Sequence, residues 1–524
     1  MKKIFIYVLA GMTMLPMATG CNSLDLESES TITDPNYWKS DTHFSAFNVG
    51  LHAQLRERTY NLFILGEPRA DIYGDDPFGG EATQGMERFP YNSLNAENVG
   101  LSNFADLYGV INQINLMIAK TTETQLLPEV SKNYYLGEAY GIRAFLYFHL
   151  LRSWGDVILH LDYTSGSTID LANILKPASP ASAVMEQIKN DISASEAAFG
   201  NDYSYKYGKH YWSLGATKML KGEVYLWSGK QMDGGATDYN MAKSALQEVK
   251  NCPGIGLESN FTDVFAYNNK KNEEIIFTIH NGQDEYDMWK DSYRMTLVPQ
   301  QAYMTSGIYF NEDGVSYADT KDAEMNGLIR LQIKKDFYNK VFLKGDTRKA
   351  GSIKAVYQKD ADGNLVYVAP IPYKFQGTMI AGSSTRSWLD DYPIYRYADC
   401  LLLLAEAKAL LGEDIAAEIN AVRERAYGKE YFEATVAYPN DKGDFYTNNP
   451  FVAGDENPVE AVLKERLREL MYEGKRWYDI RTLGYTEKYS TANSSRLLWP
   501  IDANTLTNNK ELKQTPGYTT DNKE

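Results

Sequence analysis

The stretch that most constrains this chain runs from Asn457 to Gly484, close to its carboxyl end. Asn457 suits a helix cap, Pro458 fits the first helical turn, and Glu460 follows three residues after the cap. Apolar residues then recur at helical spacing: Leu463, Leu467, Leu470, Met471, Trp477 and Ile480. This pattern predicts one long amphipathic helix with a single apolar face.

The other positions of this stretch carry many charges: Glu465, Arg466, Arg468, Glu469, Glu473, Arg476, Asp479 and Arg481. Arg466 and Glu469 are three residues apart, as are Glu473 and Arg476, so each pair can meet on a helix surface. Charges in this arrangement are typical of a salt-bridged outer face. Their spacing alone does not indicate catalysis.

The order of residues is more specific than the charge pattern. Residues 465–481 read E-R-x-R-E-L-x-x-E-G-x-R-x-x-D-I-R. Further strings precede and follow this one: R-A-x-x-Y-x-x-L from Arg143 with Trp154-Gly155-Asp156 after it, R-Y-A-x-x-L-L-x-x-A-E-A from Arg396, I-N-x-V-R-x-R-A from Ile419, L-W-P-I from Leu498 and Q-T-P-G-Y from Gln514. In this order they resemble the motifs of the SusD/RagB family, surface lipoproteins of Bacteroidetes that bind nutrients for an outer-membrane transporter.

Helical periodicity extends over most of the chain. Seven further segments show it: 34–58, 104–120, 136–152, 181–199, 212–230, 396–412 and 419–428. Two segments, 274–280 and 366–375, are β-branched and aromatic and predict short strands. Paired amphipathic helices bury their faces only by stacking on neighbours, which periodicity alone describes as helical hairpins. The resemblance implies a SusD-like, mainly α fold with tetratricopeptide-like helix pairs and an irregular, loop-rich region.

The expected organisation is one domain over residues 21–524. A helical scaffold would occupy about 34–250 and 396–484, with an irregular ligand-side region at about 251–395. Residues 1–20 are expected to be a lipoprotein signal peptide, since Lys2 and Lys3 precede a short apolar run. Ala18-Thr19-Gly20-Cys21 is similar to a lipobox, which predicts acyl chains on Cys21 that anchor the protein to a membrane. The resemblance implies that this is the outer membrane, with the protein at the cell surface. A plain secretory signal with an incidental cysteine is the alternative.

The formal net charge of −16 and the absence of a basic run argue against nucleic-acid binding. The two remaining cysteines, Cys252 and Cys400, are far apart in sequence. They are either a disulfide or, as the apolar helical surroundings of Cys400 favour, buried free thiols.

Aromatic side chains are abundant, with 39 Tyr, 20 Phe and 8 Trp. Three predicted loops set such rings among charged groups, which suits recognition of sugar rings and hydroxyls. From these loops we take Asp71, Tyr73, Trp289, Arg386 and Trp388 as candidate ligand-binding residues. For each of the two tryptophans, a packed core position is the alternative and the commoner case.

No histidine pair has metal-ligand spacing, and no nucleophile elbow or phosphate-binding loop occurs. We therefore expect no metal, no cofactor and no enzyme activity. Because acids are abundant, a membrane-anchored glycoside hydrolase stays as an alternative. The resemblance implies non-catalytic binding of a nutrient oligosaccharide, or of a peptide, and a SusC-like TonB-dependent transporter as partner.

Overall fold

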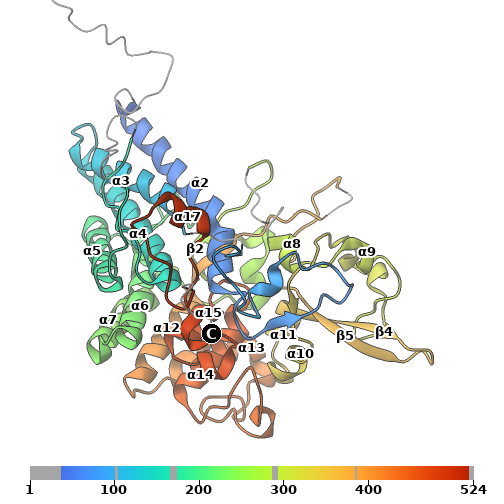
Figure 1. Cartoon of the computed structure of the whole chain (residues 1–524). Helices are drawn as coiled ribbons and strands as arrows, with labels where there is room; N and C mark the ends of the chain where they lie inside the picture. Colours follow the sequence, from blue (N-terminus) through green and yellow to red (C-terminus); the bar gives the residue numbers. More distant parts are fainter. Residues whose placement is uncertain are drawn as a thin grey trace, which may run out of the picture.

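The computed structural model describes residues 37–100, 104–165, 174–285, 289, 293–383 and 386–518. Helices fill one side of the molecule, and a long β-hairpin projects from the other side (Figure 1). The prediction of a mainly α fold with helix pairs and a few short strands is confirmed. The predicted signal peptide and Cys21 lie outside the described residues.

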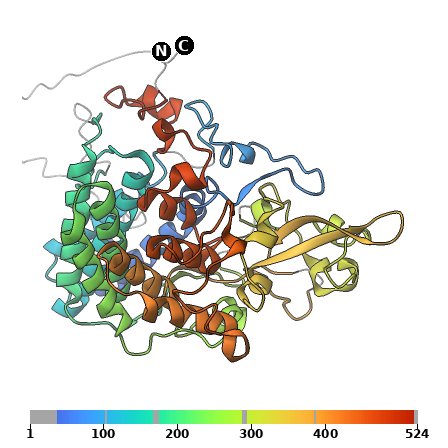
Figure 2. The same ribbon diagram turned by 90° about the horizontal axis from the view of Figure 1, so that it is seen from below.

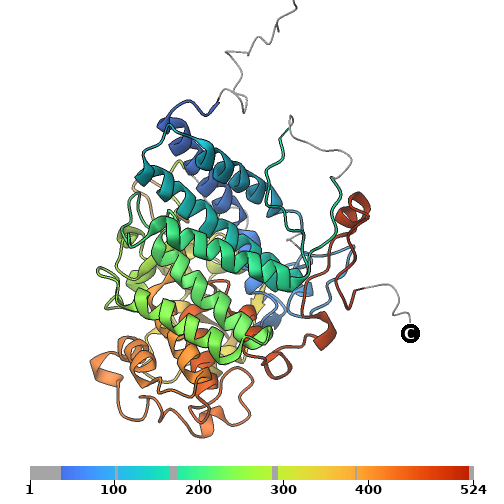
Figure 3. The same ribbon diagram turned by 90° about the vertical axis from the view of Figure 1, so that its left-hand side faces the viewer.

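The helical side is a stack of consecutive antiparallel helices: α2 (Asp41–Gly66), α3 (Tyr108–Glu123), α4 (Glu129–Trp154), α5 (Ala181–Phe199), α6 (Leu214–Gln231) and α7 (Gly235–Lys250). From α3 onward each helix packs against the next one along the chain, as Figure 3 shows. Gly222 permits one of these close approaches, because a Cβ there would lie 2.7 Å from a methyl carbon of Leu246 in α7. Helix α5 has its predicted bounds, whereas α7 was not predicted.

A second group of helices follows the irregular region: α12 (Tyr397–Leu410), α13 (Ala416–Tyr431), α14 (Pro458–Leu470), α15 (Arg476–Thr482), α16 (Thr486–Tyr489) and α17 (Ala503–Asn508). Helix α12 packs against α7 on one side and α14 on another. In Figure 2 the orange and red helices of this group lie between the helical stack and the projecting hairpin.

The region between the two helical groups contains short elements. In the described residues the strands form three antiparallel pairs: β1 (Tyr73–Asp75) with β3 (Gln332–Ile333), β2 (Ile275–Ile279) with β6 (Tyr392–Arg396), and β4 (Ile353–Lys359) with β5 (Leu365–Pro372). The short helices are α8 (Arg294–Leu297), α9 (Gln301–Met304), α10 (Phe337–Lys340) and α11 (Arg348–Ser352). Single 3-10 turns are η1 (Met86–Arg88), η2 (Phe261–Phe265), η3 (Tyr267–Asn269), η5 (Tyr317–Asp319), η6 (Lys321–Glu324), η7 (Asp444–Tyr446) and η8 (Ser494–Arg496).

The long helix predicted over 457–484 is wrong in one respect: the structure divides it into α14 and α15. Asn457 does cap α14, since its side chain accepts from the backbone N–H groups of Val459 and Glu460. The break comes at Tyr472 and Gly474, whose φ angles are +69° and +72°. A left-handed residue ends a helix, so the chain turns before α15 begins.

The outer-face interpretation of the charges in α14 is also wrong. Lys464, Glu465, Arg466, Arg468 and Glu469 are all fully buried, because α14 is covered by α12 on one side and by the irregular region on another. The predicted pairs do not form. Instead Arg466 bonds to Asp399 and Asp479, and the short-range pair within α14 is Arg468 with Glu465 at 3.2 Å.

The end of the chain folds back onto the first helices. The guanidinium of Arg69 donates to the backbone carbonyl oxygens of residues 496, 497 and 498. The backbone N–H of Trp499 donates to Ser153 at 2.7 Å, and the indole of Trp154 donates to Pro500 at 3.1 Å. This C-terminal segment (496–500) therefore closes the end of α4.

Cys252 and Cys400 are both free thiols and both buried. The disulfide alternative is thus wrong, and the buried-thiol interpretation of Cys400 is confirmed. Within the part of the chain that the structure describes, no helix has the length and apolar character needed to cross a bilayer.

Candidate functional site

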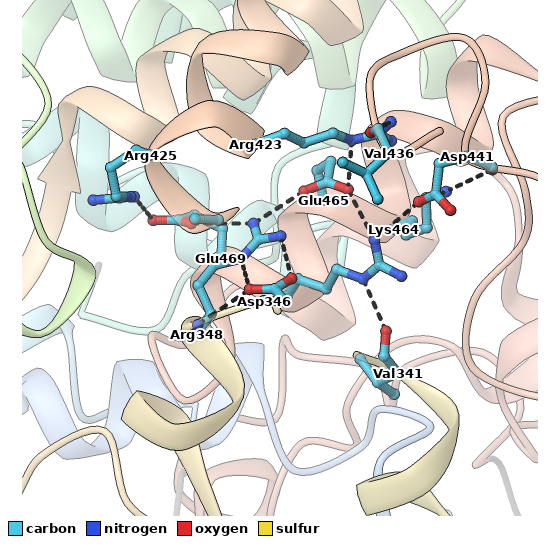
Figure 4. A network of polar contacts seen from close by, with 12 residues as sticks. Val341, Asp346, Arg348, Arg423, Arg425, Val436, Asp441, Lys464, Glu465 and Glu469 are labelled. Carbon is cyan, nitrogen blue, oxygen red and sulfur yellow. Dashed lines mark hydrogen bonds and ion pairs between the residues drawn. The ribbon is translucent and has the colours of Figure 1, made fainter. Parts of the chain in front are cut away.

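A buried ion network joins α14 to the irregular region (Figure 4). Arg348 of α11 lies 2.9 Å from Glu465 and 3.3 Å from Glu469, and it also pairs with Asp346 at 2.7 Å. From the scaffold side, Arg423 of α13 reaches Glu465 at 3.0 Å. Two carboxylates of α14 therefore bind segments that are more than 40 residues away in the sequence.

The network continues at the strand that precedes α12. Arg396 pairs with Glu274 and Glu469 at 2.6 Å each and with Glu473 at 2.9 Å. Lys374, two residues after the end of β5, pairs with Glu473 at 2.6 Å. The hairpin and the β2–β6 pair are thereby anchored to the turn between α14 and α15.

Opposite charges decide the protonation of these buried carboxyls. Burial by itself raises the pKa of Glu465, but Arg348, Arg423 and Arg468 outweigh burial and hold that pKa well below its ordinary value. Glu469 behaves in the same way, with Arg425, Arg396 and Arg348 as its neighbours. Because every one of these acids is matched by a cation, the network holds the irregular region in place and leaves no carboxyl poised for acid–base catalysis.

Two of the residues predicted to bind ligand lie against α15 and the end of α2. Asp71 is 5% exposed, and both of its carboxylate oxygens accept from Arg476, at 2.9 and 2.6 Å. Tyr73 is 1% exposed, and its hydroxyl donates to Glu67 at 3.4 Å. Their ligand-binding role stays a prediction, and the contacts seen here are structural.

The other three predicted residues lie together in a separate part of the irregular region. The indole of Trp289 donates to the backbone oxygen of Asp390 at 2.7 Å, which joins its loop to the loop of the other two residues. Arg386 donates to the backbone of Gln376 and Lys321, and Trp388 donates to Asn326 at 2.8 Å.

All three side chains are buried. The structure therefore joins the loop of Trp289 to the loop that carries Arg386 and Trp388. Asp71 and Tyr73 instead contact Arg476 and Glu67.

A cavity of about 720 Å³ opens beside these loops, and we call it the tyrosine–lysine cavity. Its walls come from the segments 311–322 and 338–355, which include α10, α11 and the start of β4: Asn311, Glu312, Asp313, Tyr317, Thr320, Lys321, Asp322, Tyr338, Phe342, Leu343, Lys344, Gly345, Asp346, Lys349, Ala350, Ile353, Lys354 and Ala355. All of these residues belong to the region that the sequence predicts to be irregular. A volume of this size is typical of small-ligand sites.

One wall pairs an aromatic ring with a lysine. The Lys349 ammonium lies 3.8 Å from the ring centroid of Tyr338, whose hydroxyl donates to Glu312 at 2.9 Å. Among the described residues no carboxylate lies within 4.0 Å of the Lys349 ammonium. Burial lowers the pKa of Lys349, and Glu312 offsets this in part. Lys349 thus keeps hydrogen-bond donors available at the cavity wall.

A second ring and lysine repeat this arrangement. The Lys354 ammonium lies 3.6 Å from the centroid of the Tyr373 ring and 2.5 Å from Asp322. The same carboxylate accepts from the Tyr373 hydroxyl at 3.0 Å. Tyr373 itself is buried and does not line the cavity. The wall therefore combines the Tyr338 ring with ammonium donors and carboxylate acceptors, which are groups that a hydroxyl-rich ligand can bind.

The sequence analysis did not select Tyr338, Lys349 or Lys354. It selected candidates from loops that contain tryptophan. Tyr338, Lys349 and Lys354 lie instead in short segments whose apolar residues show neither helical nor strand periodicity. Their only local signal is Tyr338 three residues after Lys335 within a run of lysines and aromatics. In the part of the chain that the structure describes, no three His, Cys, Asp or Glu side chains are grouped as a metal site.

Comparison with known proteins connects this architecture to a family. The SusD family model matches residues 266–496. The solved structure of B. fragilis NanU is 64% identical, covers 94% of this chain and all of its own, and superposes with a TM-score of 0.90. A SusD superfamily protein from Bacteroides vulgatus is 62% identical over 92% of this chain and all of its own, with a TM-score of 0.88.

A curated relative is more distant in sequence. SusD-like protein P38 of Formosa agariphila is 26% identical over 96% of this chain and 97% of its own length. The sequence motifs, the helical stack with its irregular region and these similarities agree, and the chain belongs to the SusD family.

Proposed function

We propose that this protein binds a nutrient oligosaccharide at the cell surface and delivers it to a SusC-like TonB-dependent transporter. The observation that carries the proposal is the tyrosine–lysine cavity, with Lys349 above the Tyr338 ring and Lys354 above the Tyr373 ring. As a member of the SusD family the chain is a non-catalytic binding protein, so the glycoside hydrolase alternative is dropped.

The chemistry of the cavity favours a sugar over a peptide. Sugar rings present an apolar face that stacks on aromatic rings, and their hydroxyls both donate and accept hydrogen bonds. The walls offer acceptors at Glu312 and Asp322 and donors at Lys349 and Lys354. A peptide bound by strand addition would instead need a free sheet edge for backbone pairing. A peptide ligand in the same role is the second candidate, and the binding experiment below separates the two.

The proposed location rests on the amino-terminal sequence. Lipid on Cys21 would attach the protein to the outer membrane after removal of residues 1–20. Replacing Cys21 with Ser should release the protein from the membrane fraction, and mass spectrometry of the wild-type amino-terminal peptide should show the acyl mass. Recovery of the Ser variant in the membrane fraction would contradict lipid anchoring.

Hand-over to the transporter is proposed as lid closure. The SusD-like protein would cover the mouth of the barrel with the irregular region facing it, so that bound ligand is enclosed between the two proteins. The transporter would supply the energy for uptake. Purification of the lipidated protein from its native membrane should recover the barrel in a defined ratio, and recovery of the protein alone would count against this step.

Calorimetric titration tests the ligand and the cavity together. Residues 22–524 would be titrated with soluble polysaccharides, their oligosaccharides and mixed peptides. We expect saturable heat with a glycan, and we expect Lys349→Ala to weaken that binding at least tenfold, since a charged hydrogen bond contributes about 1.5–3 kcal/mol.

Lys340→Ala is the matched control. Lys340 lies on α10 beside Tyr338 but pairs with Asp336 on the surface, and it does not line the cavity. Saturable heat with peptides only would show that the ligand is a peptide and not a glycan. Equal glycan affinity in both variants would exclude the tyrosine–lysine cavity as the site.

A further inference from the structure

A second cavity, of about 410 Å³, lies on another part of the irregular region. Its walls are the η2–η3 segment, the turn from Lys374 to Thr378, and Asp390. It shares no lining residue with the tyrosine–lysine cavity. We call it the Asp390 cavity. Its volume is sufficient for a ligand of about one or two sugar rings.

The carboxyl group of Asp390 is the distinctive feature of this cavity. Asp390 is 2% exposed, and one carboxylate oxygen accepts from the backbone N–H of Gly377 at 2.7 Å. Among the described residues no lysine, arginine or histidine lies within 4.0 Å of this carboxylate. A buried carboxyl without an ion pair is costly, so its remaining hydrogen-bonding capacity is significant.

The backbone holds Asp390 in place. Its carbonyl oxygen accepts from the indole of Trp289 at 2.7 Å and from the amide of Asn281 at 2.9 Å. The carboxyl group is therefore fixed at the wall and does not depend on a mobile loop tip. Trp289, one of the predicted ligand-binding residues, acts here as a support for the wall.

The charged groups around this carboxyl are committed to other partners. Lys270 lies 3.0 Å from Asp391, and Lys374 lies 2.6 Å from Glu473. His280 also contacts Asp391, at 3.1 Å. Asp263, on η2, accepts from Asn260 at 2.8 Å.

Burial raises the pKa of Asp390 to about 7, and the Gly377 N–H and the charge of Lys270 offset this in part. The group therefore changes its charge close to neutral pH.

The rest of the lining is neutral and polar, with one half-buried ring. Thr262, Asn268 and Thr378 line the cavity, and none of their side chains has a hydrogen-bond partner among the described residues. The ring of Tyr267 and the buried Phe265 supply an apolar surface. Hydroxyl and amide groups that face a cavity in this way can exchange water for ligand hydroxyls.

We propose that the Asp390 cavity is a second binding site that takes a neutral, hydroxylated ring of about one sugar unit, and that the Asp390 carboxylate accepts hydrogen bonds from its hydroxyls. Binding then weakens as the pH falls, because a protonated carboxyl is a poorer acceptor. This site goes beyond the proposed function, since it needs neither the tyrosine–lysine cavity nor the transporter.

The test uses residues 22–524 and four neutral probes: glucose, galactose, mannose and N-acetylglucosamine. Saturation-transfer NMR identifies a bound probe, and calorimetry then measures its affinity at about pH 6 and about pH 8, one unit on either side of the pKa. The ionised fraction changes about tenfold over this range, so we expect affinity about tenfold higher at the upper pH.

Asp390→Asn keeps the acceptor oxygen but removes the charge, and it should abolish the pH dependence. Thr378→Val, whose side chain has no partner to lose, gives a second readout with little risk to folding, and it should lower affinity several-fold. Lys340→Ala, a surface change that lines neither cavity, serves as the control and should leave monosaccharide binding unchanged. Lys349→Ala is measured beside it and reports on the tyrosine–lysine cavity.

Failure of all four probes to bind would overturn the proposal, as would pH-independent binding that both cavity variants retain. Loss of monosaccharide binding in Lys349→Ala alone would place the probe in the tyrosine–lysine cavity. That result would reject the second site and leave the proposed function standing.

Discussion

The carboxylate of Glu67 accepts a hydrogen bond from the backbone N–H of Tyr472 at 2.9 Å, although 405 residues separate the two in the sequence. The other carboxylate oxygen accepts from the backbone of Lys475 at 3.2 Å. Glu67 follows the last residue of α2, so α2 ends on the turn that separates α14 from α15. A single buried side chain thus fixes the break in the predicted long helix.

The close approach of these segments predicts that Gly66→Ala is destabilising. A Cβ at Gly66 would lie 2.0 Å from the carbonyl oxygen of Gly474, which is a backbone atom and cannot rotate away. Overpacking of this kind costs about 1–3 kcal/mol or more. Urea unfolding followed by tryptophan fluorescence measures the loss.

Gly50→Ala is the control on the same helix. Nothing lies within 4 Å of its added Cβ, so the variant should be unchanged or more stable by about 0.5–1 kcal/mol. Equal stability of the two variants would show that α2 shifts to accept the methyl group.

Glu67 also predicts a pH dependence. Burial raises the pKa of Glu67 to about 7 from its ordinary value of 4.5, against the opposing effect of the Tyr472 N–H. The folded state therefore favours the protonated form. Its stabilising effect is complete below about pH 4.5 and is lost as the pH rises through about 7.

As the pH rises from about 5 to about 8, the wild type should therefore lose stability that Glu67→Gln keeps. The free energy of unfolding of Glu67→Gln relative to the wild type should increase by about 2–3 kcal/mol over this range. Paired urea titrations at the two pH values give this difference. A constant difference between the proteins would mean that Glu67 keeps one charge state throughout.

Removal of a cation from the buried network should be among the most damaging changes. Arg348→Ala leaves Asp346, Glu465 and Glu469 without their shared partner in a fully buried setting. The expected cost is about 3–5 kcal/mol. The surface pair of Lys340 with Asp336 provides the comparison, and Lys340→Ala should cost less than about 1 kcal/mol.

Acid should act on the same network. The carboxyl pKa of Glu465 is held below its ordinary value, so its contribution to stability is present above about pH 4.5 and falls away at lower pH. The Arg348→Ala protein should accordingly lose less stability on acidification than the wild type. An equal loss of stability on acidification in the wild type and in Arg348→Ala would contradict this prediction.

Because both thiols are buried, we expect them to react slowly with thiol reagents in the folded protein. Burial raises the pKa of Cys252 to about 11, with Glu248 adding to the effect, and Cys400 is fully buried. Ellman's reagent should react slowly with native residues 22–524 and should titrate two thiols after unfolding without reductant. Cys252→Ser should reduce the count to one, and the absence of thiols after unfolding would indicate a disulfide.

The local patterns in the sequence predicted much of the secondary structure. The helix at Ala181–Phe199 and the strand at Ile275–Ile279 follow from apolar spacing and β-branched residues, both of which are local signals. Helix α7 was missed because its first turns contain Gly235, Asp238 and Asn240, which are weak helix formers. Packing against α6 and α12 stabilises it all the same.

Long-range pairing accounts for what the sequence did not show. The local sequence around Glu465 and Glu469 is typical of a helix surface. Both are nevertheless buried, and they pair with Arg348 and Arg396, which lie more than 70 residues away in the sequence. The candidate site has the same origin. Its walls are formed by α10, α11 and β4, and no local pattern indicates that these elements enclose a cavity.

The C-terminal segment that closes the end of α4 has a consequence for biogenesis. Ser153 and Trp154 form hydrogen bonds with Trp499 and Pro500, respectively. Arg69 donates to backbone carbonyl groups just before Trp499. While the polypeptide is being synthesised, the first helices have no such partners. Contacts of such sequence separation also form slowly. Folding of the amino-terminal half can therefore be completed only after nearly the whole polypeptide has been made.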